Sequence, residues 1–534
     1  MGYNVKNENP GKTDNKKKRD YIMRYHSTRN NKLIMTSMEV IKQGLSPEGG
    51  LFVPDSIPKL DREELARLIS ADYRQRAQEI LSLYLSDYSP QQLTYCIENA
   101  YSTARFSSSD IAPVTVLGEE LHILELWHGP TCAFKDMALQ ILPYLMTTAI
   151  QSTGDQKEIV ILTATSGDTG KAALEGFRDV PGTAILVFYP LEGVSPMQKL
   201  QMVTQEGSNT AVSAVKGNFD DAQTGVKRIF QDTHLAEQME QRGFRFSSAN
   251  SINWGRLVPQ IVYYFSSYLD LAKQNRITLG QEINIVVPTG NFGNILAAWY
   301  AKEMGLPVNR LICASNDNKV LTDFIHTGIY DKRREFVQTI SPSMDILVSS
   351  NLERLLYELG GRDDVQLRRL MEQLMEQGYY KIEGKALETL QSIMWGGYAS
   401  VEETLASIRD TFHDTGYTLD PHTAVGKCVY DAYCRETGDN RATLLVSTAS
   451  PFKFPGDVLH ALQTYAADRS DLSRPFDAGH DAVQLLEQLA EVSGMPIPNP
   501  LQGLREKKIR HTSVCSREEM KEQVAGFVKK REMK

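Results

Sequence analysis

Short β-branched runs alternate with helical patterns along most of this chain, and this alternation limits its fold more than any other feature. The runs cover residues 159–163, 184–188, 211–215, 283–287, 311–314 and 444–448. Successive parallel strands need a crossover of about a dozen residues or more, and a helix is the usual crossover. The 534 residues suffice for about two or three domains. We therefore predict an α/β protein with parallel sheets.

Two of these strands run into glycine-rich loops that a helix follows. The first glycine loop is Thr165-Ser-Gly-Asp-Thr-Gly170, with a helix expected to begin near Lys171. The second glycine loop is Pro288-Thr-Gly-Asn-Phe-Gly293, and it precedes an apolar helix. Exposed N–H groups at a helix start attract an anion, and glycine lets the anion approach closely. Neither loop matches a P-loop or a dinucleotide-binding pattern, so an ordinary tight turn is the competing interpretation of each.

A lysine stands in a third informative segment, His128-Gly-Pro-Thr-Cys-Ala-Phe-Lys-Asp136. There, a loop rich in turn formers enters an apolar helix. A lysine held at such a junction can form an imine with a carbonyl cofactor, and pyridoxal phosphate is the usual partner. A solvated lysine at a helix end is the alternative. The two glycine loops favour the cofactor, so Lys135 is the predicted catalytic residue, and Cys132 is expected to be a small packing residue.

Composition excludes several classes of function. The net charge of −8 gives no basic field for nucleic acid, and no stretch approaches the length of a membrane helix. The six cysteines show no C-x-x-C spacing, which is typical of reduced thiols in a cytoplasmic enzyme. No cluster has metal-ligand spacing, so no catalytic metal is predicted. A small-molecule substrate and a monomer or homodimer are expected.

The chain divides into regions of different character. Residues 1–24 are polar and are predicted to be a disordered tail, with a nuclear address or a nucleic-acid arm as the alternative. Residues 25–115 form a small, mostly helical domain, with helices at 61–69, at 75–85 and after Ser89. Residues 351–410 are a helix-rich insertion, and the chain after His480 is expected to be helical.

Seven motifs, in order, resemble those of threonine synthase, in its longer form with an N-terminal domain. They are HGPT-x-AFKD at 128–136, TSGDTG at 165–170, NSIN at 250–253, PTGNFG at 288–293, SPSMDI at 341–346, DPHTAVG at 420–426 and STASPFKF at 447–454. The resemblance runs from Tyr25 to Gly456. It implies the two-lobed, tryptophan-synthase-β-like pyridoxal-phosphate fold type II. The family-type N-terminal domain is then 25–115, the catalytic region 116–475 and a C-terminal helical segment 476–534.

The resemblance also implies roles for the motif residues. The cofactor phosphate is expected at Gly290, Asn291, Phe292, Gly293 and Asn294, although the family commonly has aspartate at the last position. Thr448 matches a hydroxyl near the cofactor ring nitrogen, and a plain strand hydroxyl is its alternative. Asp168 is expected to face the phenolic edge of the cofactor or else to cap the following helix. The loop that binds the substrate carboxylate is expected to comprise Thr165, Ser166, Gly167 and Thr169.

The implied reaction converts O-phospho-L-homoserine and water to L-threonine and phosphate by γ-elimination and β-addition of water, a carbon–oxygen lyase acting on phosphate. A second phosphate then needs a site, for which Lys171, Arg256 and Lys453 are candidates, and surface salt bridging is the alternative for each. His128 is expected to contact the substrate, with a structural histidine as its alternative. Ser450 departs from the histidine often found there. One alternative is a phospholyase that releases phosphate, ammonia and 2-oxobutyrate. Another is a catalytically silent binding protein.

Overall fold

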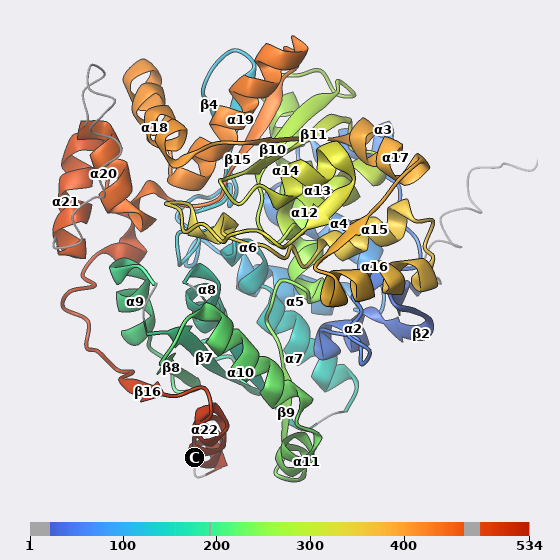
Figure 1. Ribbon diagram of the computed structural model, residues 1–534, viewed down its shortest axis with the longest axis vertical. Helices are drawn as coiled ribbons and strands as arrows, with labels where there is room; N and C mark the ends of the chain where they lie inside the picture. Colours follow the sequence, from blue (N-terminus) through green and yellow to red (C-terminus); the bar gives the residue numbers. More distant parts are fainter. Residues whose placement is uncertain (1–21, 155, 166, 192–193, 464–480, 533–534) are drawn as a thin grey trace, which may run out of the picture.

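The computed structural model describes residues 22–154, 156–165, 167–191, 194–463 and 481–532. Two large sheets form its framework, and both are parallel as expected, apart from one antiparallel edge strand. The first has the order β14-β11-β10-β15-β5-β4 and the second the order β16-β8-β7-β6-β9. Figure 1 shows the first in the upper lobe and the second in the lower lobe, with α6 between them.

The six strands predicted from β-branched runs are confirmed, with bounds that differ by at most three residues. The first sheet contains β4 (Val114–Val116), β5 (Leu121–Glu125), β10 (Ile283–Pro288), β11 (Val308–Ser315), β14 (Met394–Tyr398) and β15 (Thr443–Ser447), and β4 is its antiparallel edge. The second contains β6 (Glu158–Ala164), β7 (Thr183–Pro190), β8 (Thr210–Val215), β9 (Phe244–Ser247) and β16 (Ser513–Cys515). Every residue of β7 and β10 is buried, which is why these strands are continuously apolar.

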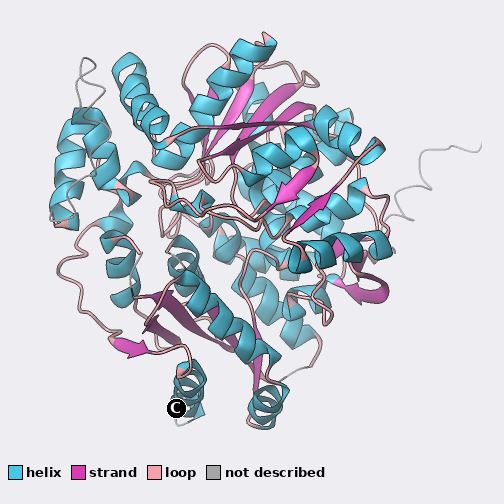
Figure 2. Cartoon of the chain, viewed as in Figure 1, coloured by secondary structure: helices cyan, strands magenta, loops and turns pink. Residues whose placement is uncertain are grey.

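Helices cover both faces of each sheet, as Figure 2 shows. Ile159 and Ile161 of β6 join the main apolar cluster, whereas Val160 and Leu162 face a second cluster beneath α10 and α22. The catalytic-region helices are α6 (Asp136–Leu139), α7 (Leu142–Ser152), α8 (Asp168–Phe177), α9 (Pro196–Val203), α10 (Phe219–Gln231), α11 (Thr233–Gln241), α12 (Trp254–Lys273), α13 (Gly293–Glu303), α14 (Val320–Thr327), α19 (Pro421–Thr437) and α20 (Pro455–Gln463). Two short 3-10 helices, η1 (Pro342–Met344) and η2 (Pro451–Lys453), lie among them.

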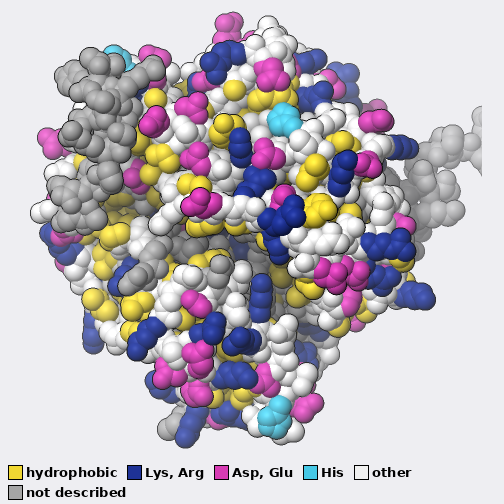
Figure 3. Space-filling model, in the orientation of Figure 1, with side chains coloured by type: hydrophobic (Ala, Val, Ile, Leu, Met, Phe, Trp, Pro, Cys, Tyr) yellow, Lys and Arg dark blue, Asp and Glu magenta, His cyan; other side chains and the backbone are white. Residues whose placement is uncertain are grey.

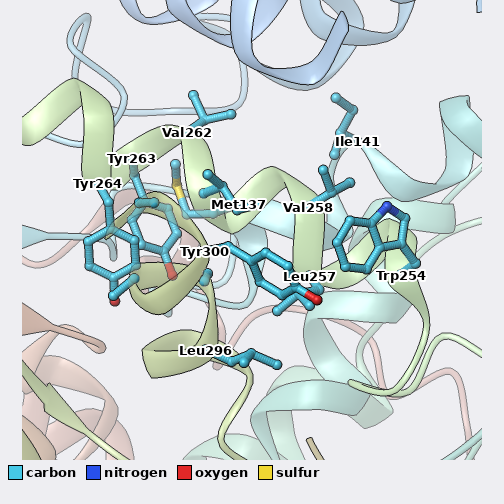
Figure 4. Packing of buried hydrophobic residues seen from close by; sticks show 14 of the residues in the cluster. Met137, Ile141, Trp254, Leu257, Val258, Val262, Tyr263, Tyr264, Leu296 and Tyr300 are labelled. Carbon is cyan, nitrogen blue, oxygen red and sulfur yellow. The ribbon is translucent and has the colours of Figure 1, made fainter. Parts of the chain in front are cut away.

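Helix α12 is the centre of the main core. Its side chains pack against α13 and α6, and Figure 4 shows Val258 and Val262 of α12 near Met137 of α6. The Trp254 ring meets the Tyr300 ring edge-on with a centroid separation of 5.4 Å. Because α6 follows Lys135 directly, this packing fixes the position of the lysine.

The N-terminal region contains the expected helices and also a sheet that the sequence did not predict. Helices α3 (Arg62–Leu68), α4 (Tyr73–Tyr84) and α5 (Pro90–Ala100) are confirmed, each with a capping box at its start, and α2 (Ser37–Gln43) is additional. The three-stranded antiparallel sheet comprises β1 (Arg24–Ser27), β2 (Asn30–Thr36) and β3 (Phe52–Pro54). None of the three strands alternates between buried and exposed residues: β1 is buried apart from Arg24, β3 is buried throughout, and β2 has no buried residue.

Two other regions are less helical than expected. The segment 351–410 holds α15 (Leu352–Leu359), α16 (Asp364–Glu376), α17 (Lys385–Ile393) and most of α18 (Val401–Thr415), but its strand β14 pairs with β11 in the first sheet. Its β13 (Tyr379–Lys381) pairs with β12 (Ile329–Asp331). The C-terminal part has α21 (Ala482–Ser493), η4 (Asn499–Leu501) and α22 (Met520–Glu532), and also β16, which extends the second sheet beside β8. Strands β13 and β16 have three residues each, too few to show a period, and β14 contains two adjacent glycines.

The surface carries mixed charge. Acidic and basic side chains are interspersed on the face drawn in Figure 3. Among the described residues, no helix combines the length and the apolar character needed to cross a membrane. The predicted tail lies outside the described residues up to position 21, as does the predicted boundary at 475.

Candidate active site

Lys135 lies in the interior between the two lobes. Ala133 forms a β-bridge to Ala449, and the Phe134 N–H donates to the Thr448 carbonyl at 2.8 Å, which pins this segment to the end of β15. The lysine side chain is only 11% exposed. Its Nζ donates to Ser343 Oγ at 3.1 Å and lies 3.7 Å from Asp168 Oδ2. Burial lowers the pKa of Lys135, and although Asp168 opposes this effect, Arg256 and Lys453 lower the pKa further.

Asp168 begins α8 and forms ion pairs with two lysines. Its Oδ1 lies 3.0 Å from Lys453 Nζ and accepts from Gln198 Nε2, also at 3.0 Å. Burial alone would raise the pKa of Asp168, but Lys453 and Lys135 hold it below its usual value. The N-cap of α8 is Gly167 and has no side-chain hydrogen bond, so the carboxylate of Asp168 pairs with the lysines and does not cap the helix. Helix α8 begins at Asp168, three residues before the position expected.

The first glycine loop uses its threonine internally. Thr165 Oγ1 accepts from the N–H groups of Gly167 and Gly170, at 3.0 and 2.9 Å. Gly167 has a φ of +152°, and a Cβ there would lie 2.4 Å from Gln198 Oε1, so only glycine fits. Thr169 is half-buried one position after Asp168. Ser166 lies outside the described residues. The Thr165 hydroxyl therefore shapes the loop, which differs from its expected use on a substrate.

The second glycine loop is held through its carbonyls. Ser349 Oγ donates to the Gly290 carbonyl at 2.7 Å, and Asn351 Nδ2 donates to the Asn291 carbonyl at 2.9 Å. Phe292 adopts a left-handed φ of 64°, and α13 then begins at Gly293. The first N–H groups of a helix have no partner within the helix. The loop therefore presents amide donors at the start of α13.

The two polar atoms of the Asn294 side chain differ in their hydrogen bonding. Its Oδ1 accepts from the hydroxyls of Tyr263 and Tyr264. Its Nδ2 is buried and has no hydrogen-bond partner among the described residues. A buried donor without an acceptor is costly unless a ligand supplies one. The amide thus offers an unpartnered donor beside the N-terminus of α13.

The three basic residues that are candidates for binding a second phosphate differ in their partners. Lys171 pairs with Glu175 at 3.2 Å and Lys453 with Asp168, so an ion pair accounts for each. Arg256, in the first turn of α12, donates Nη1 to the Ala249 carbonyl at 2.8 Å and leaves Nε unpartnered among the described residues. Burial lowers the pKa of Arg256 to about 10. Of these three candidates, Arg256 is therefore the one without a carboxylate partner among the described residues.

His128 is engaged by protein groups on both ring nitrogens. Nε2 lies 2.8 Å from Glu125 Oε2 and Nδ1 lies 3.1 Å from Ser107 Oγ, while the ring stacks on Trp127. This geometry matches the structural alternative for His128.

The STASPFKF segment packs against the residues that precede Lys135. Thr448 is buried directly after β15. Ser450 donates its N–H to the Cys132 carbonyl, and its hydroxyl accepts from Phe452 N. Burial raises the pKa of the Cys132 thiol to about 12, which fits the packing role.

Sequence reasoning gave no individual role to several residues that the fold brings to Lys135. Ser343, in η1, contacts both Lys135 and Asp168, and its N–H donates to His422 Nε2 at 3.2 Å. Gln201 Oε1 accepts from Lys453 Nζ at 2.7 Å. The sequence did contain a signal for Ser343 and His422, since they belong to the SPSMDI and DPHTAVG motifs. Both motifs were recognised there, but no chemistry was assigned to their residues.

The side chains present fit pyridoxal phosphate. A buried amine of lowered pKa, a glycine loop that presents amide donors at the start of a helix, and the unpartnered Nδ2 of Asn294 are the groups such a cofactor requires. In particular, a Cβ at Gly290 would lie 2.4 Å from the Ser343 carbonyl, so the loop can approach η1 only because it has glycine there.

Comparisons with known proteins agree with this fit. The family model "Threonine synthase N terminus" matches residues 24–101, and "Pyridoxal-phosphate dependent enzyme" matches residues 111–448. Threonine synthase-like 1 of Homo sapiens is 43% identical over 83% of this chain, and the alignment covers 60% of that protein. The chain thus spans less than two thirds of the threonine synthase-like 1 proteins that it matches.

Threonine synthases match over nearly their full length. The Saccharomyces cerevisiae enzyme is 36% identical over 83% of this chain and 90% of its own. The structure of PLP-bound threonine synthase from Brucella melitensis superposes with a TM-score of 0.81 at 33% identity, covering 95% of this chain and 99% of that one. This chain belongs to the threonine synthase family of pyridoxal-phosphate-dependent enzymes.

Proposed function

We propose that the protein is a threonine synthase, a lyase that converts O-phospho-L-homoserine and water to L-threonine and phosphate. The observation that carries the proposal is the charge balance around Lys135. Lys135 and Lys453 share Asp168, whereas Arg256 is buried without a carboxylate partner among the described residues. A buried cation without a counter-charge is costly, so this site favours a ligand that brings an additional anion.

The substrate carries two anionic groups, a carboxylate and a phosphate. The cofactor phosphate is assigned to the amide donors of Gly290, Asn291, Phe292, Gly293 and Asn294, at the start of α13. Arg256 is assigned to the substrate phosphate. The first glycine loop, with Thr165, Ser166, Gly167 and Thr169, is assigned to the substrate carboxylate.

Lys135 is assigned as the base and acid. The bound cofactor supplies an electron sink that stabilises negative charge developing on the substrate carbon chain. Burial lowers the pKa of Lys135, so a larger fraction of the amine is neutral and able to take a proton near neutral pH. Ser343 Oγ, 3.1 Å from Nζ, orients the amine. Elimination and addition move protons at neighbouring carbons, and a single lysine can reach both of these carbons.

Two further groups tune the cofactor. Asp168, held ionised by Lys453, is assigned to the phenolic edge of the cofactor. The Thr448 hydroxyl is assigned to the ring nitrogen. A neutral hydroxyl does not enforce protonation of that nitrogen, whereas a carboxylate would. This choice restrains delocalisation at the α-carbon and favours elimination and replacement further along the chain.

The region boundaries 25–115, 116–475 and 476–534 are part of the same proposal, and the family-model matches at 24–101 and 111–448 support the first two. A cytoplasmic location and a monomer or homodimer stay predictions from the sequence.

Product analysis tests the reaction. Purified protein loaded with pyridoxal phosphate is incubated with O-phospho-L-homoserine, and threonine, 2-oxobutyrate and phosphate are quantified. Equal amounts of threonine and phosphate are expected, and Lys135→Ala, which lacks the amine, is expected to yield neither. Phosphate release without threonine contradicts the proposal.

A phospholyase is the second candidate, because the chain is more similar to proteins whose name does not state the synthase reaction than to a named threonine synthase. The chain is 43% identical to proteins named threonine synthase-like 1 and 36% identical to the yeast threonine synthase. The same assay separates the candidates, because a phospholyase forms 2-oxobutyrate and ammonia as its main products.

A further inference from the structure

A buried arginine outside the motifs joins the second glycine loop to the N-terminal region. The loop is held at the Asn291 carbonyl, which accepts from both the N–H and the Nδ2 of Asn351, at 3.1 and 2.9 Å. The Oδ1 of Asn351 in turn accepts from Arg354 Nη1. Asn351 is fully buried, so these contacts exclude water.

Arg354 makes two more contacts, each to a different segment. Its Nε donates to the Phe52 carbonyl of β3 at 2.9 Å, and its Nη2 donates to the Ile252 carbonyl at 2.6 Å. Ile252 belongs to the NSIN segment, just before α12 and Arg256. One guanidinium therefore fixes the second glycine loop, the start of α12 and β3 at once.

The rest of α15 is also attached to the N-terminal sheet. Glu353 accepts from Thr28 Oγ1 at 2.6 Å and from Arg29 Nη2 at 2.7 Å. The Tyr357 hydroxyl lies 2.7 Å from His26 Nε2. Helix α15 is thus attached to β1 and to the loop that follows it, and Asn351, just before its first residue, reaches the second glycine loop.

We propose that Arg354 is a positioning residue for the cofactor phosphate. It orients Asn351, and Asn351 holds the Asn291 carbonyl so that the N–H groups of the loop stay directed at the phosphate. The N-terminal region then contributes to the binding of the cofactor phosphate, because it helps to hold Arg354 in place. This inference rests on the proposed function, since it assumes that the second glycine loop binds the phosphate.

The fold offers a matched control for a purely structural role. Arg76 is also buried and also joins separate segments: it donates to the Leu68 carbonyl at 3.1 Å, to the Ser266 carbonyl at 3.1 Å and to Asp270 Oδ1 at 2.7 Å. Its contacts do not include the glycine loops. Loss of Arg76 should therefore cost stability without changing phosphate recognition.

The experiment titrates cofactor-free protein with pyridoxal 5′-phosphate and, separately, with pyridoxal, which has no phosphate. Wild type, Arg354→Gln, Asn351→Ala and Arg76→Gln are compared by the change in visible absorption. Arg354→Gln and Asn351→Ala are expected to weaken binding of pyridoxal phosphate by about tenfold or more, the size expected when a buried polar contact is lost. Binding of pyridoxal is expected to change little in both variants. Arg76→Gln is expected to lower the melting temperature and to leave the ratio of the two affinities as in wild type.

An unchanged affinity ratio in Arg354→Gln overturns the inference. If that variant does not fold, Asn351→Ala decides, because it removes the side-chain contact to the loop and leaves the arginine in place. A wild type that binds neither compound contradicts the proposed function itself, which distinguishes the two failures.

Discussion

Removing Lys453 tests the charge balance on which the proposed function depends. Lys453 is fully buried and lies 3.0 Å from Asp168, whose side chain is 3% exposed. In Lys453→Met the apolar part of the side chain is kept, but Asp168 loses its principal counter-charge. Breaking a buried ion pair by removing one partner costs about 3–5 kcal/mol. Because Lys135 stays 3.7 Å from Asp168, we expect the lower end of that range.

The loss depends on pH with a definite sign. The pKa of Asp168 is lowered in the folded protein, so its ionised form stabilises the fold above the ordinary aspartate pKa of 3.8, and this contribution is lost as the pH falls. In Lys453→Met the pKa of Asp168 rises, because Lys453 no longer offsets the effect of burial. The stability difference between wild type and variant is therefore largest near neutral pH and shrinks toward about pH 4.

Thermal unfolding of the cofactor-free protein measures this effect. For a chain of this length the unfolding entropy is about 1 kcal/mol per degree, so a loss of about 3 kcal/mol lowers the melting temperature by about 3 °C. The double variant Asp168→Asn/Lys453→Met removes both charges and is expected to recover part of the loss. Melting temperatures for Lys453→Met that equal those of wild type from about pH 5 to pH 8 would refute the reasoning, as would a double variant less stable than Lys453→Met.

Three other substitutions probe single contacts of the site. Arg256→Met is expected to lower kcat/KM for O-phospho-L-homoserine by about tenfold to hundredfold, the value of a lost charged hydrogen bond, while cofactor affinity stays unchanged; a loss of cofactor affinity instead would place the arginine at the other phosphate. Ser343→Ala removes the hydroxyl that accepts from Lys135, so the pKa of the amine should fall further and the acid limb of the pH–rate profile should move to lower pH; an upward move contradicts that role. Gly290→Ala places a Cβ 2.4 Å from the Ser343 carbonyl, so the loop must shift and cofactor affinity should drop in equilibrium titration, whereas an alanine at Gly118, where a Cβ meets no atom within 4 Å, is the control.

Local patterns determined much of the fold. The strands β6, β7, β10 and β15 were predictable because parallel strands buried on both faces are continuously apolar. Helices α3 and α4 were predictable because their apolar residues recur at helical spacing, and α5 because Ser89 precedes Pro90 at its start. Lys135 and the two glycine loops stood out for the same reason, since each is a local signature of a turn before a helix.

The short strands could not be found in this way. Three-residue strands such as β3 and β16 have too few side chains to show a period, and β14 places two glycines in a central position of the sequence Met-Trp-Gly-Gly-Tyr. Their pairing depends on which sheet edge the rest of the chain presents.

The sequence by itself determined the class of the fold, the lysine and the loops, because short-range spacing encodes each of them. Only the tertiary structure decided which charges meet. Asp168 pairs with Lys453 and not with a helix end, Ser343 reaches Lys135 across 208 positions, and Arg354 reaches Phe52 across 302. Contacts at such separations depend on how two lobes and an N-terminal sheet pack together, and no local pattern records that packing.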